Sequence, residues 1–127
     1  MKTIPFSSPD IQNSDLKAVE AVIRSGWLAH GKYSKKLEQL FCEYTGAKYA
    51  VATVNGTAAL HVAIELAGVN IGDEVLSQAL TFIATCNAIS YAGAHPVFVD
   101  VDSDTMGMSP DALREFLETH AEKTISG

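Results

Sequence analysis

Hydrophobic residues recur at helical spacing in the first third of the chain. The first segment places its apolar side chains three or four positions apart, at Leu16, Val19, Val22 and Ile23. Asn13 or Ser14 is expected to cap this helix, and Gly26 is expected to end it. A "WLAHG" linker follows, and then the stretch "KYSKKLEQLFCEYTG" repeats the helical pattern up to a closing glycine, Gly46. These patterns predict two amphipathic helices over residues 1–47.

From residue 48 onwards the pattern alternates between strand and helix. Strands are expected over "KYAVATV" (48–54), around Val75 to Gln78, and over the Val-rich "HPVFVDV" (95–101), which is typical of the interior of a parallel sheet. Helices are expected over 56–68, 81–93 and 108–120, the last with Ser109 as N-cap and Pro110 at its first position. This alternation predicts an α/β fold over residues 48–127, with right-handed crossovers and a mainly parallel sheet.

The tail, "HAEKTISG", ends just after a helix, where another strand would be expected. A sheet of three strands leaves two edges exposed, which is an unfavourable end for a natural domain. We therefore expect this chain to be part of a longer protein.

Composition narrows the class of protein. The net charge of −6 argues against nucleic acid as a partner, because such proteins carry a basic face. The two cysteines, Cys42 and Cys86, form neither a CxxC pair nor a disulfide framework, which favours a reducing compartment. No signal peptide is expected, because the opening "MKTIPFSSPD" has no apolar core, and no membrane span is expected, because no apolar run approaches roughly 20 residues. The expectation is a cytoplasmic protein without a membrane partner.

The sheet pattern also predicts where a ligand would bind, because open α/β sheets bind ligands beyond the carboxyl ends of their strands. The helix beginning at Gly56, Thr57 and Ala58 follows the first expected strand. Its free N–H groups and the helix dipole form an anion site, to which the Thr57 hydroxyl adds a donor. The alternative is that these residues are small because the helix packs tightly against the sheet.

A second strand-to-helix junction places Phe82 beside the same sheet edge. Its aromatic face is suited to cover a flat ring, and the alternative is an ordinary core phenylalanine. No Rossmann, P-loop or nucleophile-elbow motif is present. The four histidines lack metal-ligand spacing, and "DVDSDT" lacks the glycine and final glutamate of a calcium loop, so it is interpreted as a turn after a strand. No metal site is expected.

Three stretches in order along the chain resemble the opening of the pyridoxal-phosphate-dependent nucleotide-sugar aminotransferases of the DegT/StrS (DegT/DnrJ/EryC1/StrS) type. They are "SGWLAHGKY", "GAKYAVATVNGTAALHVAIELAGVNIGDEV" and "TFIATCNAISYAGAHPVFVDVDSDT", within a match from about Pro5 to Leu117. The resemblance implies the aspartate-aminotransferase fold (PLP fold type I), of which this chain would be the front part of the large domain.

The resemblance also implies roles for particular residues. Gly56, Thr57 and Ala58 would hold the phosphate of pyridoxal 5'-phosphate, and Phe82 would stack on its ring. Within the same block as Phe82, Thr85 and Asn87 would support the cofactor pocket. The loop from Trp27 to Gly31, which includes His30, resembles the family segment that lies near the sugar substrate, often the substrate of a neighbouring subunit. The departures from the family pattern, Asn55 and Ala29-His30, bear on substrate identity.

The family's Schiff-base lysine lies downstream of everything matched here, so no catalytic residue is expected in this chain and the chain alone should be inactive. The implied parent enzyme transfers an amino group, with glutamate as the expected donor, to a nucleotide-linked keto sugar in surface glycan or polysaccharide biosynthesis, as a homodimer. Two alternatives stay open: a PLP-dependent sugar dehydratase of the same fold, and a non-catalytic anion-binding or association module.

Overall fold

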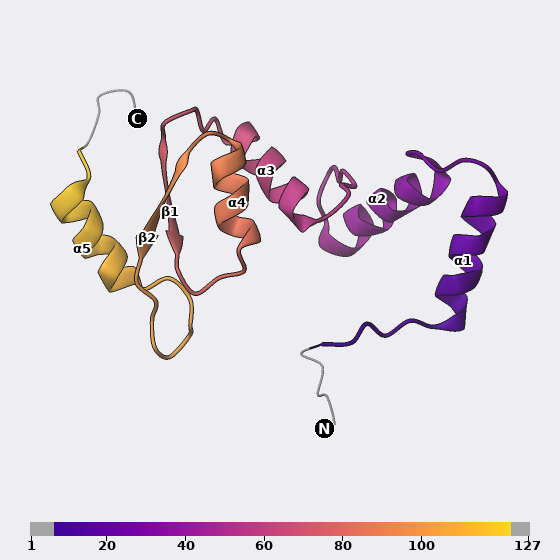
Figure 1. Ribbon diagram of the computed structural model, residues 1–127, viewed down its shortest axis with the longest axis horizontal. Helices are drawn as coiled ribbons and strands as arrows, with labels where there is room; N and C mark the ends of the chain where they lie inside the picture. The colour runs from indigo at the N-terminus through magenta and orange to yellow at the C-terminus, as the bar shows by residue number, and fades with distance from the viewer. Residues whose placement is uncertain (1–6, 123–127) are drawn as a thin grey trace, which may run out of the picture. The chain divides into compact units, whose positions relative to one another are not determined.

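The computed structural model describes residues 7–122, which form two compact units that divide between Ala52 and Thr53 (Figure 1). We call them the N-terminal unit and the α/β unit. The N-terminal unit contains α1 (Asn13–Arg24) and α2 (Lys32–Thr45), as the helical spacing predicted. No helix within residues 7–122 combines the length and the apolar character that crossing a bilayer requires.

The ends of these two helices follow from local chemistry. The N-cap of α1 is Gln12 and not the expected Asn13 or Ser14, because the Asp15 carboxylate reaches back to accept the Gln12 N–H at 2.9 Å. Gly26 follows α1 with φ of +70°, and Gly46 ends α2 with φ of +74°, donating its N–H to the Cys42 carbonyl at 2.9 Å. Both glycines were predicted to end these helices, since the left-handed conformation favours glycine.

The α/β unit is built from α3 (Gly56–Leu66), β1 (Glu74–Gln78), α4 (Ala84–Tyr91), β2 (His95–Val99) and α5 (Pro110–His120). The two strands pair in parallel, in a register that runs from Glu74 opposite His95 to Gln78 opposite Val99. Helices α3 and α4 lie on one side of the strands and α5 on the other (Figure 1). These layers confirm the expected fold class, a partial α/β domain with a parallel sheet and flanking helices.

A small core joins α4 to the sheet. The buried apolar side chains within residues 7–122 are Ala88, Ile89, Ala92, Ala94 and Val99. Ile89 is the largest of them and is 2% exposed. Because its neighbours are mostly alanines, α4 can approach the strands closely, and the packing depends on Ile89.

The strand expected over residues 48–54 is absent. Tyr49, Val51 and Val54 are 77%, 82% and 90% exposed, and the Ala52 N–H donates to the Glu38 carboxylate at 2.9 Å. The β-branched sequence gives this segment strand propensity, but a strand also needs a hydrogen-bonded neighbour, and no described segment pairs with it. The described sheet therefore has two strands where three were predicted.

The position of β2 in the sheet also differs from the prediction. Its Val-rich sequence indicated an interior strand, yet only β1 pairs with it among the described residues. Pro96 pairs with Val75 and has no N–H to donate to a second neighbour. Pro96 was the residue that indicated an edge strand, but the Val-rich composition of the segment led to the prediction of an interior strand.

Candidate functional site

The amino end of α3 is arranged around Asn55. Its carbonyl accepts the Ala59 N–H at 3.1 Å, and its side-chain Oδ1 accepts the Ala58 N–H at 2.9 Å. Asparagine is among the best N-cap residues, so this role could have been predicted from the sequence. Within residues 7–122 the N–H groups of Gly56 and Thr57 have no acceptor, and both point away from the helix at its positive end. The helix thus offers two free backbone donors, while Ala58 is already capped.

The space over Gly56 is open. A Cβ atom added at this glycine would meet no heavy atom of the described residues within 4 Å. Tight packing inside the α/β unit therefore does not explain the glycine, and an approaching anion can reach the two N–H groups without a side chain in its way.

The loop between β1 and α4 carries the second part of the site. Phe82 is 78% exposed, which rules out the core alternative within the described structure. It lies two residues before α4, and its carbonyl accepts the Thr85 N–H at 3.1 Å. The Thr85 hydroxyl lies 3.1 Å from that of Thr81, which ties this loop to the first turn of the helix.

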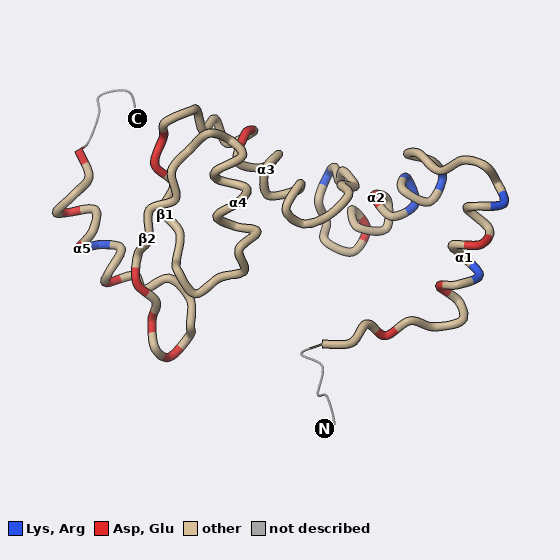
Figure 2. The backbone as a smooth tube through the Cα atoms, viewed as in Figure 1, with Lys and Arg blue, Asp and Glu red and all other residues tan. Residues whose placement is uncertain are grey.

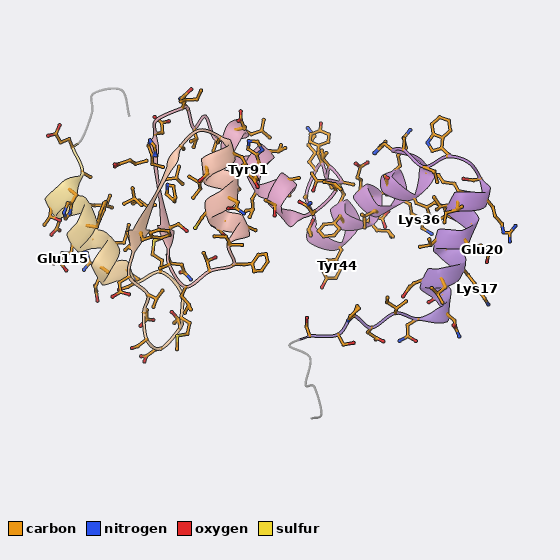
Figure 3. All side chains as sticks on the ribbon, in the orientation of Figure 1. Lys17, Glu20, Lys36, Tyr44, Tyr91 and Glu115 are labelled. Carbon is orange, nitrogen blue, oxygen red and sulfur yellow. The ribbon has the colours of Figure 1, made fainter. Side chains whose placement is uncertain are left out.

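Packing of α3 against α4 brings the two parts to one end of the unit. The His61 ring of α3 meets Tyr91 of α4 edge-on, with the ring centres 5.8 Å apart, and Figure 3 labels Tyr91 between the two helices. The amino ends of α3 and α4 face the same way as the carboxyl ends of the strands (Figure 1). Thr57, Ala58, Thr85 and Asn87 are all half-buried there.

The α/β unit is poor in basic side chains. Figure 2 shows acidic residues over its loops and over α5, and Arg114 is its single Lys or Arg among residues 53–122. The Arg114 guanidinium is already 2.9 Å from the Asp111 carboxylate. Among residues 53–122, the donors left for an anion at the amino end of α3 are therefore backbone N–H groups and hydroxyls.

The acidic loop after β2 is folded on itself. The Thr105 hydroxyl donates to the Asp102 carboxylate at 2.8 Å, and this bond lowers the pKa of Asp102, with help from the Asp104 N–H. The loop is thus the turn that the sequence predicted. Across residues 7–122 no three His, Cys, Asp or Glu side chains gather in a way that could hold a metal ion.

The Trp27 loop lies in the N-terminal unit and surrounds a hollow of about 620 Å³. The Trp27 indole N–H donates to the His30 carbonyl at 3.0 Å. His30 Nε2 lies 3.9 Å from the Glu38 carboxylate, whose other oxygen accepts the Ala52 N–H. The structure therefore places the two predicted substrate-loop residues, Trp27 and His30, next to each other in the N-terminal unit. The residues predicted to bind the cofactor all lie in the α/β unit.

Gly31 lets the Trp27 ring lie over the backbone of this loop. A Cβ atom at Gly31 would come within 2.6 Å of the Trp27 ring, so Gly31→Ala should displace the indole and break its bond to His30. We expect lower anisotropy of the tryptophan emission, because the ring of Trp27, the single tryptophan, turns more freely once its bond to His30 is broken. The control is Gly56→Ala, whose Cβ meets nothing. Unchanged anisotropy in Gly31→Ala would show that the ring does not rest on Gly31.

Comparison with known proteins identifies the family of the chain. Residues 9–126 match the DegT/DnrJ/EryC1/StrS aminotransferase family. The chain belongs to this family. Among solved structures, this DegT-family chain is similar to Spr1654 of Streptococcus pneumoniae in its PLP form, a protein assigned as a sugar aminotransferase, with 38% identity and a TM-score of 0.80 over 90% of this chain and 29% of that one.

Two further solved structures that are similar to this chain are an aminotransferase and a dehydratase. An aminotransferase from Psychrobacter cryohalolentis is 36% identical with a TM-score of 0.77, over 87% of this chain and 29% of that one. The GDP-4-keto-6-deoxy-D-mannose-3-dehydratase of E. coli, with bound hydrated PLP, is 27% identical with the same TM-score, over 91% and 31%. The DegT-family chain thus spans less than a third of the length of these relatives, and its fold is part of the aspartate-aminotransferase fold, as expected.

Proposed function

We propose that this chain forms the front part of a PLP-dependent aminotransferase that transfers an amino group, with glutamate as donor, to a keto sugar carried on a nucleotide. Family membership and the similarity to a sugar aminotransferase and to a second aminotransferase support this proposal. The structural observation that carries it is the open amino end of α3, with two free N–H donors, at the same end of the unit as the exposed Phe82.

The residues present fit the phosphate of pyridoxal phosphate. The N–H groups of Gly56 and Thr57 and the Thr57 hydroxyl would donate to it, and Ala58 would contribute its N–H only if Asn55 released it. Hydrogen bonds to a charged group contribute about 1.5–3 kcal/mol each, against about 0.3–1 kcal/mol for the helix dipole. Donors to the phosphate therefore dominate the binding.

The remaining candidates would hold the ring of the cofactor. The exposed face of Phe82 can cover a flat ring, and stacking of this kind contributes about 0.5–1.5 kcal/mol beyond burial. Thr85 supports Phe82 through its backbone N–H, and Asn87 lies two residues further along in the first turn of α4. When bound, pyridoxal phosphate supplies an electron-withdrawing ring to the carbon that gains or loses the amino group.

The whole protein is proposed to be a cytoplasmic homodimer that acts in surface glycan or polysaccharide biosynthesis. Trp27 and His30 are proposed to contact the nucleotide sugar, because they line the hollow of the N-terminal unit and lie in the loop that resembles the family's substrate segment, from which Ala29-His30 departs.

The purified 127-residue chain should not carry out the reaction. None of its lysines lies in the family's Schiff-base context, so it lacks the group that would hold the cofactor covalently and move the proton. When the chain is mixed with pyridoxal phosphate and glutamate, we expect it to form no more 2-oxoglutarate than the same mixture without protein. Turnover at enzyme-like rates would contradict this part of the proposal.

Binding of pyridoxamine phosphate tests the proposed cofactor site directly. This form has no aldehyde, so it cannot react with exposed lysines, and equilibrium dialysis against the chain reports only the non-covalent site. Saturable binding supports the proposal. If no binding occurs, the open end of α3 is not a cofactor site in this chain, and the association module becomes the better account.

The dehydratase is the second candidate, favoured by the similarity to the E. coli dehydratase over 91% of this chain. The two reactions differ in the fate of nitrogen. When the whole protein is supplied with ¹⁵N-glutamate and a nucleotide-linked keto sugar, an aminotransferase leaves ¹⁵N on the sugar. A dehydratase removes the elements of water from the sugar and leaves no nitrogen on it.

A further inference from the structure

Gln78 links the two loops at the carboxyl edge of the sheet. It is the last residue of β1, opposite Val99, and its side chain is half-buried. Its amide nitrogen donates to the Leu80 carbonyl at 2.7 Å and to the Met106 carbonyl at 3.2 Å. Both protons of one amide group are therefore used, one on the β1–α4 loop and one on the β2–α5 loop.

The contact with Met106 lies where the backbone is strained. Met106 has φ of +58°, the one positive value outside glycine among residues 7–122, and this conformation costs about 1–2 kcal/mol. Two backbone bonds of 2.8 Å close the loop around it, from the Met106 N–H to the Asp102 carbonyl and from the Asp102 N–H to the Gly107 carbonyl. The bond from Gln78 satisfies the Met106 carbonyl and helps to hold this strained turn.

The contact with Leu80 bears on the candidate cofactor site. Leu80 precedes Thr81 and Phe82 by one and two residues, and it is 54% exposed, so packing restrains it little. Within the described residues, the Gln78 side chain is the one hydrogen-bonded link between this loop and the β2–α5 loop. The Leu80 carbonyl is thus the point at which Gln78 contacts the loop that carries Phe82.

We propose that Gln78 is a positioning residue, which sets the place of Phe82 for the cofactor ring by anchoring the β1–α4 loop to the β2–α5 loop. This inference rests on the proposed function for its link to the cofactor. Gln78 itself touches neither the ring nor the phosphate and acts through Leu80. A donor is needed at this position, and a carboxylate there would repel both carbonyl oxygens.

Three substitutions separate the donor from the bulk of the side chain. Gln78→Met keeps the length and removes both donors, Gln78→Glu replaces them with acceptors, and Gln78→Lys restores donors through its ammonium group. The matched control is Gln39→Met, which removes an amide whose one bond, to Glu43 at 2.8 Å, lies within α2. Circular dichroism of each variant checks that the chain is folded.

Amide hydrogen exchange measures the anchor without any ligand. The Thr85 N–H is bonded to the Phe82 carbonyl and the Met106 N–H to the Asp102 carbonyl, so these two amides report on the two loops. We expect both to exchange about 3- to 10-fold faster in Gln78→Met and Gln78→Glu, the range that corresponds to one lost hydrogen bond. Gln78→Lys and Gln39→Met should exchange as the wild type does.

Dialysis with pyridoxamine phosphate measures the consequence for the site. Binding should weaken about 3- to 10-fold in Gln78→Met and recover in Gln78→Lys. Unchanged exchange at Thr85 in folded Gln78→Met overturns the anchor, and faster exchange with unchanged affinity overturns the link to the cofactor. If Gln78→Met does not fold, wild-type exchange in Gln78→Glu overturns the anchor. If the wild type does not bind the ligand, the proposed function fails, while the exchange rates still decide the anchor.

Discussion

Replacing Gly56 with valine should lower the affinity of the chain for pyridoxamine phosphate at least about 100-fold. The branched side chain would fill the open space over the amino end of α3, through which the phosphate has to reach the N–H groups of Gly56 and Thr57. Two hydrogen bonds to a charged group, at about 1.5–3 kcal/mol each, amount to at least 3 kcal/mol, and every 1.4 kcal/mol is tenfold in affinity. Equilibrium dialysis measures the change.

The fold should tolerate this substitution, because a Cβ at residue 56 meets no described atom and the backbone there is not left-handed. Ala59→Val is the matched control, since Ala59 is also exposed and small and lies in the first turn of α3, but its N–H is already bonded to the Asn55 carbonyl. Its affinity should remain near that of the wild type. Tight binding by Gly56→Val would mean that the phosphate is held elsewhere.

Replacing Ile89 with alanine should destabilise the α/β unit by about 2–5 kcal/mol, the usual range for removing a large aliphatic side chain from a core. Ile89 is 2% exposed, and the other buried apolar residues of the described chain are Val99 and alanines, which cannot move to fill the cavity. Because domains are stable by only about 5–15 kcal/mol, a loss of this size is a large share of the free energy of unfolding and should lower the urea midpoint clearly. Urea unfolding followed by circular dichroism measures it.

Ile71→Ala is the matched control for this prediction. Ile71 lies in the same unit and is 88% exposed, so its truncation should change the free energy of unfolding by less than about 0.5 kcal/mol. Equal effects at Ile89 and Ile71 would show that α4 does not pack on the sheet through Ile89.

Local chemistry made the helices predictable, and the strands depended on neighbours. Gly26, Gly46, Ser109 and Pro110 end or begin helices through interactions within a few residues, and the sequence shows these directly. Ser109 accepts the Ala112 N–H, as an N-cap should. The segment 48–54 has the composition of a strand, but pairing depends on a partner that composition does not reveal.

The site shows the same division. The N-cap role of Asn55 could have been predicted from its residue type alone, but Asn55 drew attention only as a departure from the family pattern. Whether Phe82 was buried or exposed could not be predicted, because that depends on which elements cover it. The bond from Gln78 to Met106 spans 28 positions along the chain, so no local pattern could have predicted it.

The scarcity of basic side chains in the α/β unit has a consequence for how an anion arrives. Backbone N–H donors attract an anion only within hydrogen-bond distance, about 3 Å. The acidic residues of the unit repel it over a Debye length, about 10 Å at 0.1 M salt. A dianionic phosphate therefore approaches against the long-range field and is stabilised only on contact. Moderate salt screens the repulsion but leaves the short bonds intact, so this site should capture its ligand faster as ionic strength rises, the opposite of a site built from lysine and arginine.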